Sequence, residues 1–150
     1  MDRLEFVVEN KQNDSFQFKS VRILINETDL IDMLRKYELP FATKEGSPTI
    51  AGGYSGIDPE SLFKYLTNPD EDDLDDFGRV SILECECGCQ GCWPMNVKIE
   101  TQDGKILWTD FEQPHRNAES HNHWDYSKFG QFEFDKRHYD ELLAKLYASR

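Results

Sequence analysis

A two-residue turn in the C-terminal half of the chain constrains the fold most. Asp103-Gly104 separates residues 95–101 from residues 106–111, and apolar and polar residues alternate in both segments. Glycine accepts the positive φ angle that a type I′ turn requires, so this pair predicts a tight antiparallel hairpin. A two-residue turn also fixes the register of the strands. The expected facing pairs are Ile99 with Trp108 and Thr101 with Ile106.

Other alternating segments extend this hairpin into a sheet. Residues 79–87 form a predicted strand before it, with Cys85 and Cys87 on one face, so residues 80–111 should make a three-stranded antiparallel meander. Residues 4–8 and 16–25 predict an N-terminal hairpin.

Helix signals occupy much of the rest of the chain. We expect one helix capped by Asn26 and ended by Pro40, and a short one that begins at Asp58-Pro59. A C-terminal helix should follow Asp135, with a buried stripe at Tyr139, Leu142, Leu143, Leu146 and Tyr147. Residues 42–57 and 113–130 are expected to be loops. The predicted class is therefore α+β, a single domain over residues 1–150 with a mostly antiparallel sheet packed by two or three helices.

The charge of the chain limits its partners. It has 29 acidic and 17 basic residues, a formal net charge of −12. Such a field repels phosphate backbones and anionic membrane surfaces, so we expect no nucleic acid and no membrane as partner. A basic protein is the partner that this charge favours. The run Asp70–Asp76, six acids in seven residues, is expected to be solvated and mobile, or alternatively a docking strip for such a partner.

All four cysteines lie in one stretch of eight residues, Cys85 to Cys92. The N-terminus has no basic and apolar segments of a secretory signal, which predicts a reducing, cytoplasmic setting. Clustered cysteines are there more often thiols or metal ligands than disulfides. Cys89 and Cys92 have the C-x-x-C spacing of a zinc knuckle, and Cys85 and Cys87 could complete it if the strand bends.

Three further interpretations of this stretch stay open. It could be a cluster of reduced, partly buried thiols in a glycine-rich turn. It could be a redox pair, since a C-x-x-C thiol can have a lowered pKa. Cysteine with His115 and Arg116 could also form a catalytic site, although the sequence around them fits no protease pattern. The tryptophans Trp93 and Trp124 are expected to pin the core and loops, and with Arg116 they border the candidate site.

A longer pattern surrounds the cysteines. It consists of Cys85-x-Cys87-Gly88-x-x-Gly91-Cys92-Trp93-Pro94, Trp108-x-x-Phe111-x-x-Pro114-His115-Arg116, Trp124-x-Tyr126 and Phe132-x-Phe134-Asp135-x-x-x-Tyr139, with Ala51-Gly52-x-Tyr54 upstream. The pattern resembles a family of small uncharacterised bacterial proteins over about residues 20–147. The family pattern has no cysteine at the position of Cys89. The resemblance therefore implies Cys85, Cys87, Cys92 and His115 as the better set of metal ligands, with Cys89 as an alternative ligand.

Two functions follow as hypotheses. The first is a soluble, non-enzymatic interaction protein, of the kind that immunity proteins and antitoxins represent, with a cysteine-rich turn that could bind zinc. The second is a small enzyme or redox protein that uses the cysteine turn with His115 and Arg116. Because the cysteine strand and the strand ending at Phe111 belong to one meander, residues 85–92 and the Pro114-His115-Arg116 segment should lie side by side.

Overall fold

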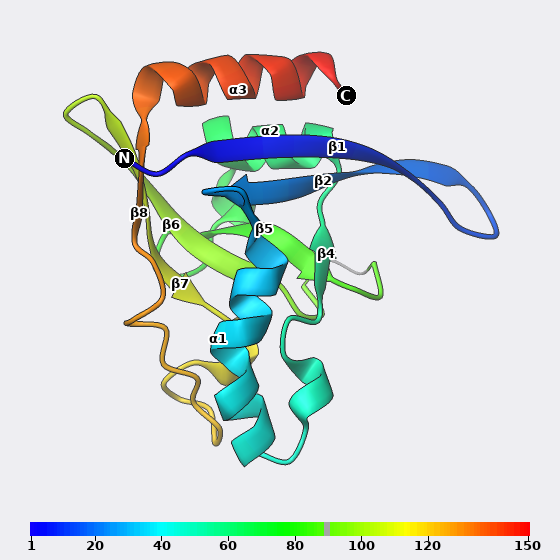
Figure 1. Ribbon diagram of the computed structural model, residues 1–150, viewed down its shortest axis with the longest axis vertical. Coiled ribbons are helices and arrows are strands. Elements are labelled where there is room, and N and C mark those ends of the chain that lie inside the picture. Colours follow the sequence, from blue (N-terminus) through cyan, green and yellow to red (C-terminus); the bar gives the residue numbers. More distant parts are fainter. Residues whose placement is uncertain (89–90) are drawn as a thin grey trace.

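Two antiparallel sheets organise the fold (Figure 1), and the computed structural model describes residues 1–88 and 91–150. One sheet has the order β1-β2-β3 and the other, which is curled, the order β4-β5-β6-β7-β8. The strands are β1 (Leu4–Gln12), β2 (Gln17–Ile25), β3 (Thr28–Asp29), β4 (Tyr54–Gly56), β5 (Val80–Cys85), β6 (Met95–Gln102), β7 (Lys105–Glu112) and β8 (Phe132–Asp135). The helices are α1 (Leu30–Lys44), α2 (Pro59–Thr67) and α3 (Lys136–Ala148), with short 3₁₀ helices η1 (Pro48–Ile50), η2 (Glu71–Asp73) and η3 (Pro114–Arg116). The predicted α+β class is confirmed.

The turn at Asp103-Gly104 joins β6 to β7 in the predicted register. Both turn residues have positive φ angles, 50° and 75°, as a type I′ turn requires. Ile99 faces Trp108 and Thr101 faces Ile106, as expected. With β5 paired to β6, the predicted meander is confirmed, and β4 and β8 extend it at its two edges.

The first helix begins later than the sequence suggested. Asn26 and Glu27 have positive φ angles of 52° and 69° and form a tight turn between β2 and the short strand β3. Asp29 is the N-cap instead, and its side chain accepts a hydrogen bond from the backbone N–H of Ile31 at 2.8 Å. The prediction of Asn26 as the cap is therefore wrong, because asparagine also tolerates the left-handed conformation that this turn needs.

Helix α1 also continues beyond Pro40, which we expected to end it. Pro40 is exposed, whereas Phe41 and Ala42 just after it face the interior. The ring of Phe41 stacks on Trp124 at 6.3 Å between centroids. Packing of this last turn offsets the hydrogen bond that proline removes from a helix.

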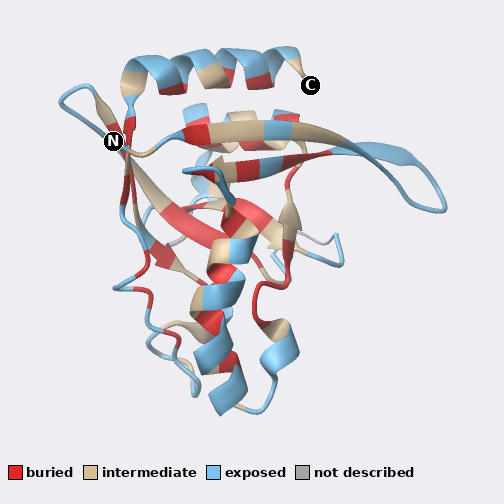
Figure 2. Cartoon of the chain, viewed as in Figure 1, coloured by how far each residue is buried: buried red, intermediate tan, exposed pale blue. Residues whose placement is uncertain are grey.

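The C-terminal helix α3 lies beside α2 and close to β1, at the top of the molecule in Figure 1. It also contacts β7, in the predicted meander, and β8 at the edge of the same sheet. The Trp108 indole N–H donates a 3.2 Å hydrogen bond to the hydroxyl of Tyr139 in the buried core. Asp135 caps α3 as predicted. Figure 2 shows the buried positions gathered between the helices and the two sheets. None of the helices in the described ranges is long and apolar enough to cross a membrane.

The acidic run is partly built into the fold. The Lys64 ammonium lies 2.7 Å from the carboxylate of Asp70 and 2.9 Å from that of Asp73, across the short helix η2. The Asp75 carboxylate accepts from the backbone and side chain of Arg79. Three of the six carboxylates therefore order this segment, and Glu71, Asp72 and Asp76 form its exposed remainder.

Candidate metal centre at the cysteine turn

The cysteine turn, residues 85–92, begins where β5 ends. The predicted strand through Cys87 is wrong, because the chain leaves the sheet at Cys85. The backbone N–H of Gly88 donates a 2.9 Å hydrogen bond to the carbonyl of Cys85, which closes a turn that Gly88 permits with a φ angle of 87°. The backbone N–H of Cys87 then lies 3.5 Å from the Cys85 Sγ. The bend that two-thiolate coordination requires is thus present.

Three sulfur atoms converge at this turn. The Sγ atoms of Cys85, Cys87 and Cys92 all lie within 4.8 Å of one another. Four ligands at about 2.3 Å in a tetrahedron around zinc would place sulfurs about 3.8 Å apart, so the present spacing fits after a contraction of about 1 Å. Cys85 is half-buried, and the other two are exposed. Cys89, the alternative ligand, lies outside the described residues.

The pKa of Cys85 disfavours a reactive thiol at this position. The hydrogen bond with the Cys87 thiol, together with burial and the Cys92 thiol, raises the pKa of Cys85 to about 11. Catalytic and redox thiols have lowered pKa values, because the thiolate is the nucleophile. A thiophilic cation would displace the proton and bind the thiolate.

The segment around His115 lies against the cysteine turn, as predicted. The His115 Nε2 is 3.2 Å from the carbonyl oxygen of Gly91, and its ring stacks on Trp93 with 5.8 Å between centroids. The buried side chain of Gln113 joins the two segments, since it donates to the carbonyl of Pro94 at 2.9 Å and accepts from the backbone of His115 at 2.7 Å. Within the described ranges, the group of ligand atoms close enough to share one ion contains the three cysteines and not His115.

Arg116, the other candidate beside the turn, is engaged in a structural clamp. Its guanidinium makes two 3.0 Å hydrogen bonds to the carboxylate of Glu45 and lies 5.0 Å and 5.5 Å from the ring centroids of Trp93 and Trp124. The Trp124 indole N–H donates to the same carboxylate at 2.7 Å. Burial alone would raise the pKa of Glu45, but these hydrogen bonds and the charge of Arg116 outweigh it and lower that pKa. The clamp therefore fixes the segment Pro114–Arg116, which lies beside the cysteine turn, to the C-terminal end of α1.

Glu45 and Gln113 were not among the residues predicted for the site. Glu45 is the C-cap of α1, where the helix dipole disfavours a carboxylate, but this signal was hidden because the helix was expected to end at Pro40. Nothing around Gln113 marked it before the fold was known.

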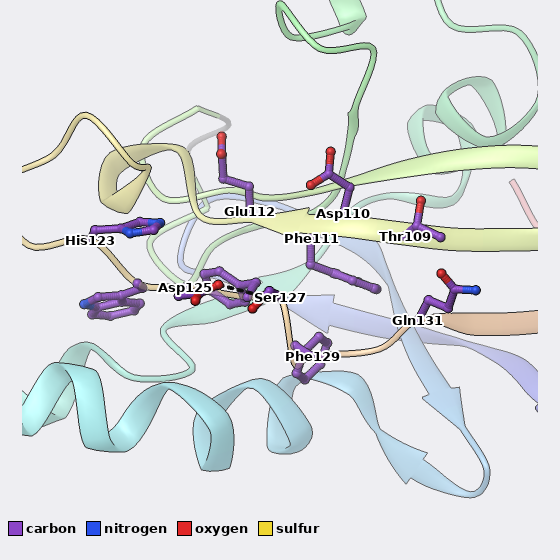
Figure 3. Close-up of a pocket in the computed structure, with 11 residues that line it drawn as sticks. Thr109, Asp110, Phe111, Glu112, His123, Asp125, Ser127, Phe129 and Gln131 are labelled. Carbon is purple, nitrogen blue, oxygen red and sulfur yellow. Dashed lines mark hydrogen bonds between the residues drawn. The ribbon is translucent and has the colours of Figure 1, made fainter.

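A cavity of about 260 Å³ lies beside β7 (Figure 3). Phe111 and Phe129 meet edge to face at 5.0 Å, and Asp110 and Glu112 point to the other side of the strand from Phe111. Those two carboxylates already pair with the buried Arg79, at 2.8 Å and 3.5 Å. The carboxylates of Asp110 and Glu112 are therefore already engaged in ion pairs with Arg79.

No family model matches the chain, and the searches of curated proteins and of solved structures found no match either.

Proposed function

We propose that this chain is a zinc-binding interaction protein in which the metal fastens the cysteine turn. The observation that carries the proposal is the convergence of the Cys85, Cys87 and Cys92 sulfurs within 4.8 Å. Thiolates select zinc among the common divalent cations that lack redox chemistry. His115 takes the fourth position after its ring turns away from the Gly91 carbonyl, and Cys89 is the alternative.

The role of the metal in this proposal is structural. A site closed by four protein ligands keeps no position for substrate or water, and it stabilises the fold that carries it. The raised pKa of Cys85 speaks against thiol catalysis by that residue, because a nucleophilic thiol needs a lowered pKa. The clamp on Arg116 supports it further, because that guanidinium already makes two hydrogen bonds to Glu45 and packs near the rings of Trp93 and Trp124.

The interaction side of the proposal rests on charge. The net charge of −12 and the exposed acids Glu71, Asp72 and Asp76 favour a basic protein as partner. Thiol ligands must stay reduced to bind metal, so the proposed setting is the cytoplasm.

The test is a cobalt titration of untagged protein, followed by displacement with zinc. Cobalt bound by thiolates gives intense charge-transfer absorption near the ultraviolet, and the expected stoichiometry is one ion per chain. Cys85→Ser, Cys87→Ser and Cys92→Ser should each weaken binding by at least about tenfold, because each removes a ligand. His115→Ala against Cys89→Ser separates the two candidates for the fourth ligand. His138→Ala, on α3, is the matched control and should bind as the natural chain does. Absence of thiolate absorption in the natural chain would overturn the proposal.

A further inference from the structure

The buried carboxylate of Glu38 lies next to β4, the strand that pairs with the end of β5 where the cysteine turn begins. Glu38 is fully buried on α1, and its carboxylate accepts three hydrogen bonds. The donors are the backbone N–H of Gly52 at 2.8 Å, the hydroxyl of Tyr54 at 2.6 Å and the hydroxyl of Tyr126 at 2.5 Å. Both oxygens of the carboxylate are therefore satisfied, one by the Gly52 backbone and the other by the two tyrosine hydroxyls.

Two of these donors belong to the segment that pairs with the cysteine strand. Tyr54 faces Cys85 in the β4–β5 pairing, and the Gly53 carbonyl accepts a 3.2 Å hydrogen bond from the backbone N–H of Glu86. The hydroxyl of Ser55 donates to the Cys85 carbonyl at 3.1 Å. The first two residues of the cysteine turn are thus held by residues 53–55.

The segment itself depends on α1 for its position. Strand β4 has three residues at the edge of its sheet, and such a short edge strand frays easily. Gly52 lies so close to α1 that a Cβ there would come within 2.5 Å of the Cβ of Arg35. Its φ angle of 67° also suits glycine, so the chain is shaped to bring Gly52 onto Glu38.

We propose that Glu38 is a positioning residue for the metal centre, which holds Gly52 and Tyr54 so that Cys85 and Glu86 are fixed in the geometry that binds metal. This inference rests on the proposed function. Removal of a group that hydrogen-bonds to a metal ligand and orients it typically lowers metal affinity by about 10- to 100-fold. Glu38 acts here through the backbone of β4 and contacts no ligand itself.

Two tyrosines offer a matched test, because Tyr54→Phe and Tyr126→Phe each remove one hydroxyl that donates to the same Glu38 oxygen. Only Tyr54 belongs to the strand that pairs with Cys85. Zinc affinity, measured by competition with a chromophoric chelator, should fall about tenfold in Tyr54→Phe and in Glu38→Gln. It should stay within about twofold of the natural chain in Tyr126→Phe.

Amide hydrogen exchange of Glu86 in metal-free protein gives a second readout that needs no zinc. Exchange should accelerate in Tyr54→Phe and Glu38→Gln relative to Tyr126→Phe, because the bond from Glu86 to Gly53 loses its support. Equal effects of the two tyrosine variants on both readouts would mean general destabilisation and would overturn the inference. If the natural chain binds no zinc, the proposed function fails, and the exchange of Glu86 alone decides whether Glu38 positions the turn.

Discussion

Buried charged side chains mark the residues that fasten distant segments in this protein. Glu45 joins Arg116 across 71 positions of sequence, and Glu38 joins Tyr126 across 88. A buried carboxylate is costly unless its oxygens are fully hydrogen-bonded, and both of these are. Burial raises the pKa of Glu38 in spite of its three donors, whereas Arg116 and Trp124 reverse the effect of burial at Glu45. A carboxylate beside an arginine can therefore serve as an anchor that stays ionised.

Glu84 on β5 lets this electrostatic reasoning be tested by pH. Burial, with a smaller contribution from Asp58, raises its pKa from 4.5 to about 6. The neutral form is thus favoured in the folded state. The resulting stabilisation is complete below about pH 4.5 and is lost as the pH rises through about 6. We expect Glu84→Gln to match the natural chain in free energy of unfolding at pH 4.5 and to exceed it at pH 7.5. Urea unfolding at the two pH values measures both free energies. If the free energies of unfolding of the two chains differ by the same amount at both pH values, the assignment is contradicted.

At the scale of elements, short strands and helix ends depend on what packs against them. Strand β4 is three residues long and exists through its pairing with β5 and its anchor on α1. Helix α1 continues beyond Pro40 because two contacts hold its C-terminal end. Phe41 stacks on Trp124, and Glu45 at the C-cap binds Arg116. Helix α3, in contrast, has the regular apolar spacing that specifies a helix from local sequence.

The two leucines at the centre of α3 give a matched test of its packing. Leu143 is buried, and Leu142 beside it is half-buried. Leu143→Ala should lower the free energy of unfolding by about 2–4 kcal/mol through the cavity it leaves. Leu142→Ala should cost less, because its site is open to water. A cost for Leu143→Ala under about 0.5 kcal/mol in urea unfolding would mean that α3 is peripheral.

For the whole molecule, the net charge of −12 opposes the compact state through self-repulsion. Within the part of the chain that the structure describes, no ion pair involves Glu71, Asp72 or Asp76. Neutralising all three as Glu71→Gln, Asp72→Asn and Asp76→Asn should raise the melting temperature by about 2 °C at low ionic strength. The gain should vanish at high salt, because salt screens exposed charges.

The control lies in the same run. Asp73→Asn also removes one negative charge, but it breaks the contacts of Asp73 with Lys64 and with the backbone of Asp70. It should therefore lower the melting temperature in calorimetry at both ionic strengths. A triple variant that behaves like Asp73→Asn would show that the exposed acids also support the fold.

Local sequence determined much of the architecture. Asp103-Gly104 specified both a turn and a register, since a type I′ turn leaves the facing residues no freedom. The caps at Asp58 and Asp135 followed from equally local rules. The side-by-side placement of the cysteine turn and His115 followed from the predicted meander. Tertiary structure decided that strand pairing with β4 ends at Cys85, after which the local turn at Gly88 brings three thiols together. It also decided that α1 passes Pro40 and that Glu38 and Glu45 hold distant segments in place. The physical reason is that these features depend on partners far away in sequence, whose contacts outweigh the local preference of proline for a helix end and of carboxylates for water.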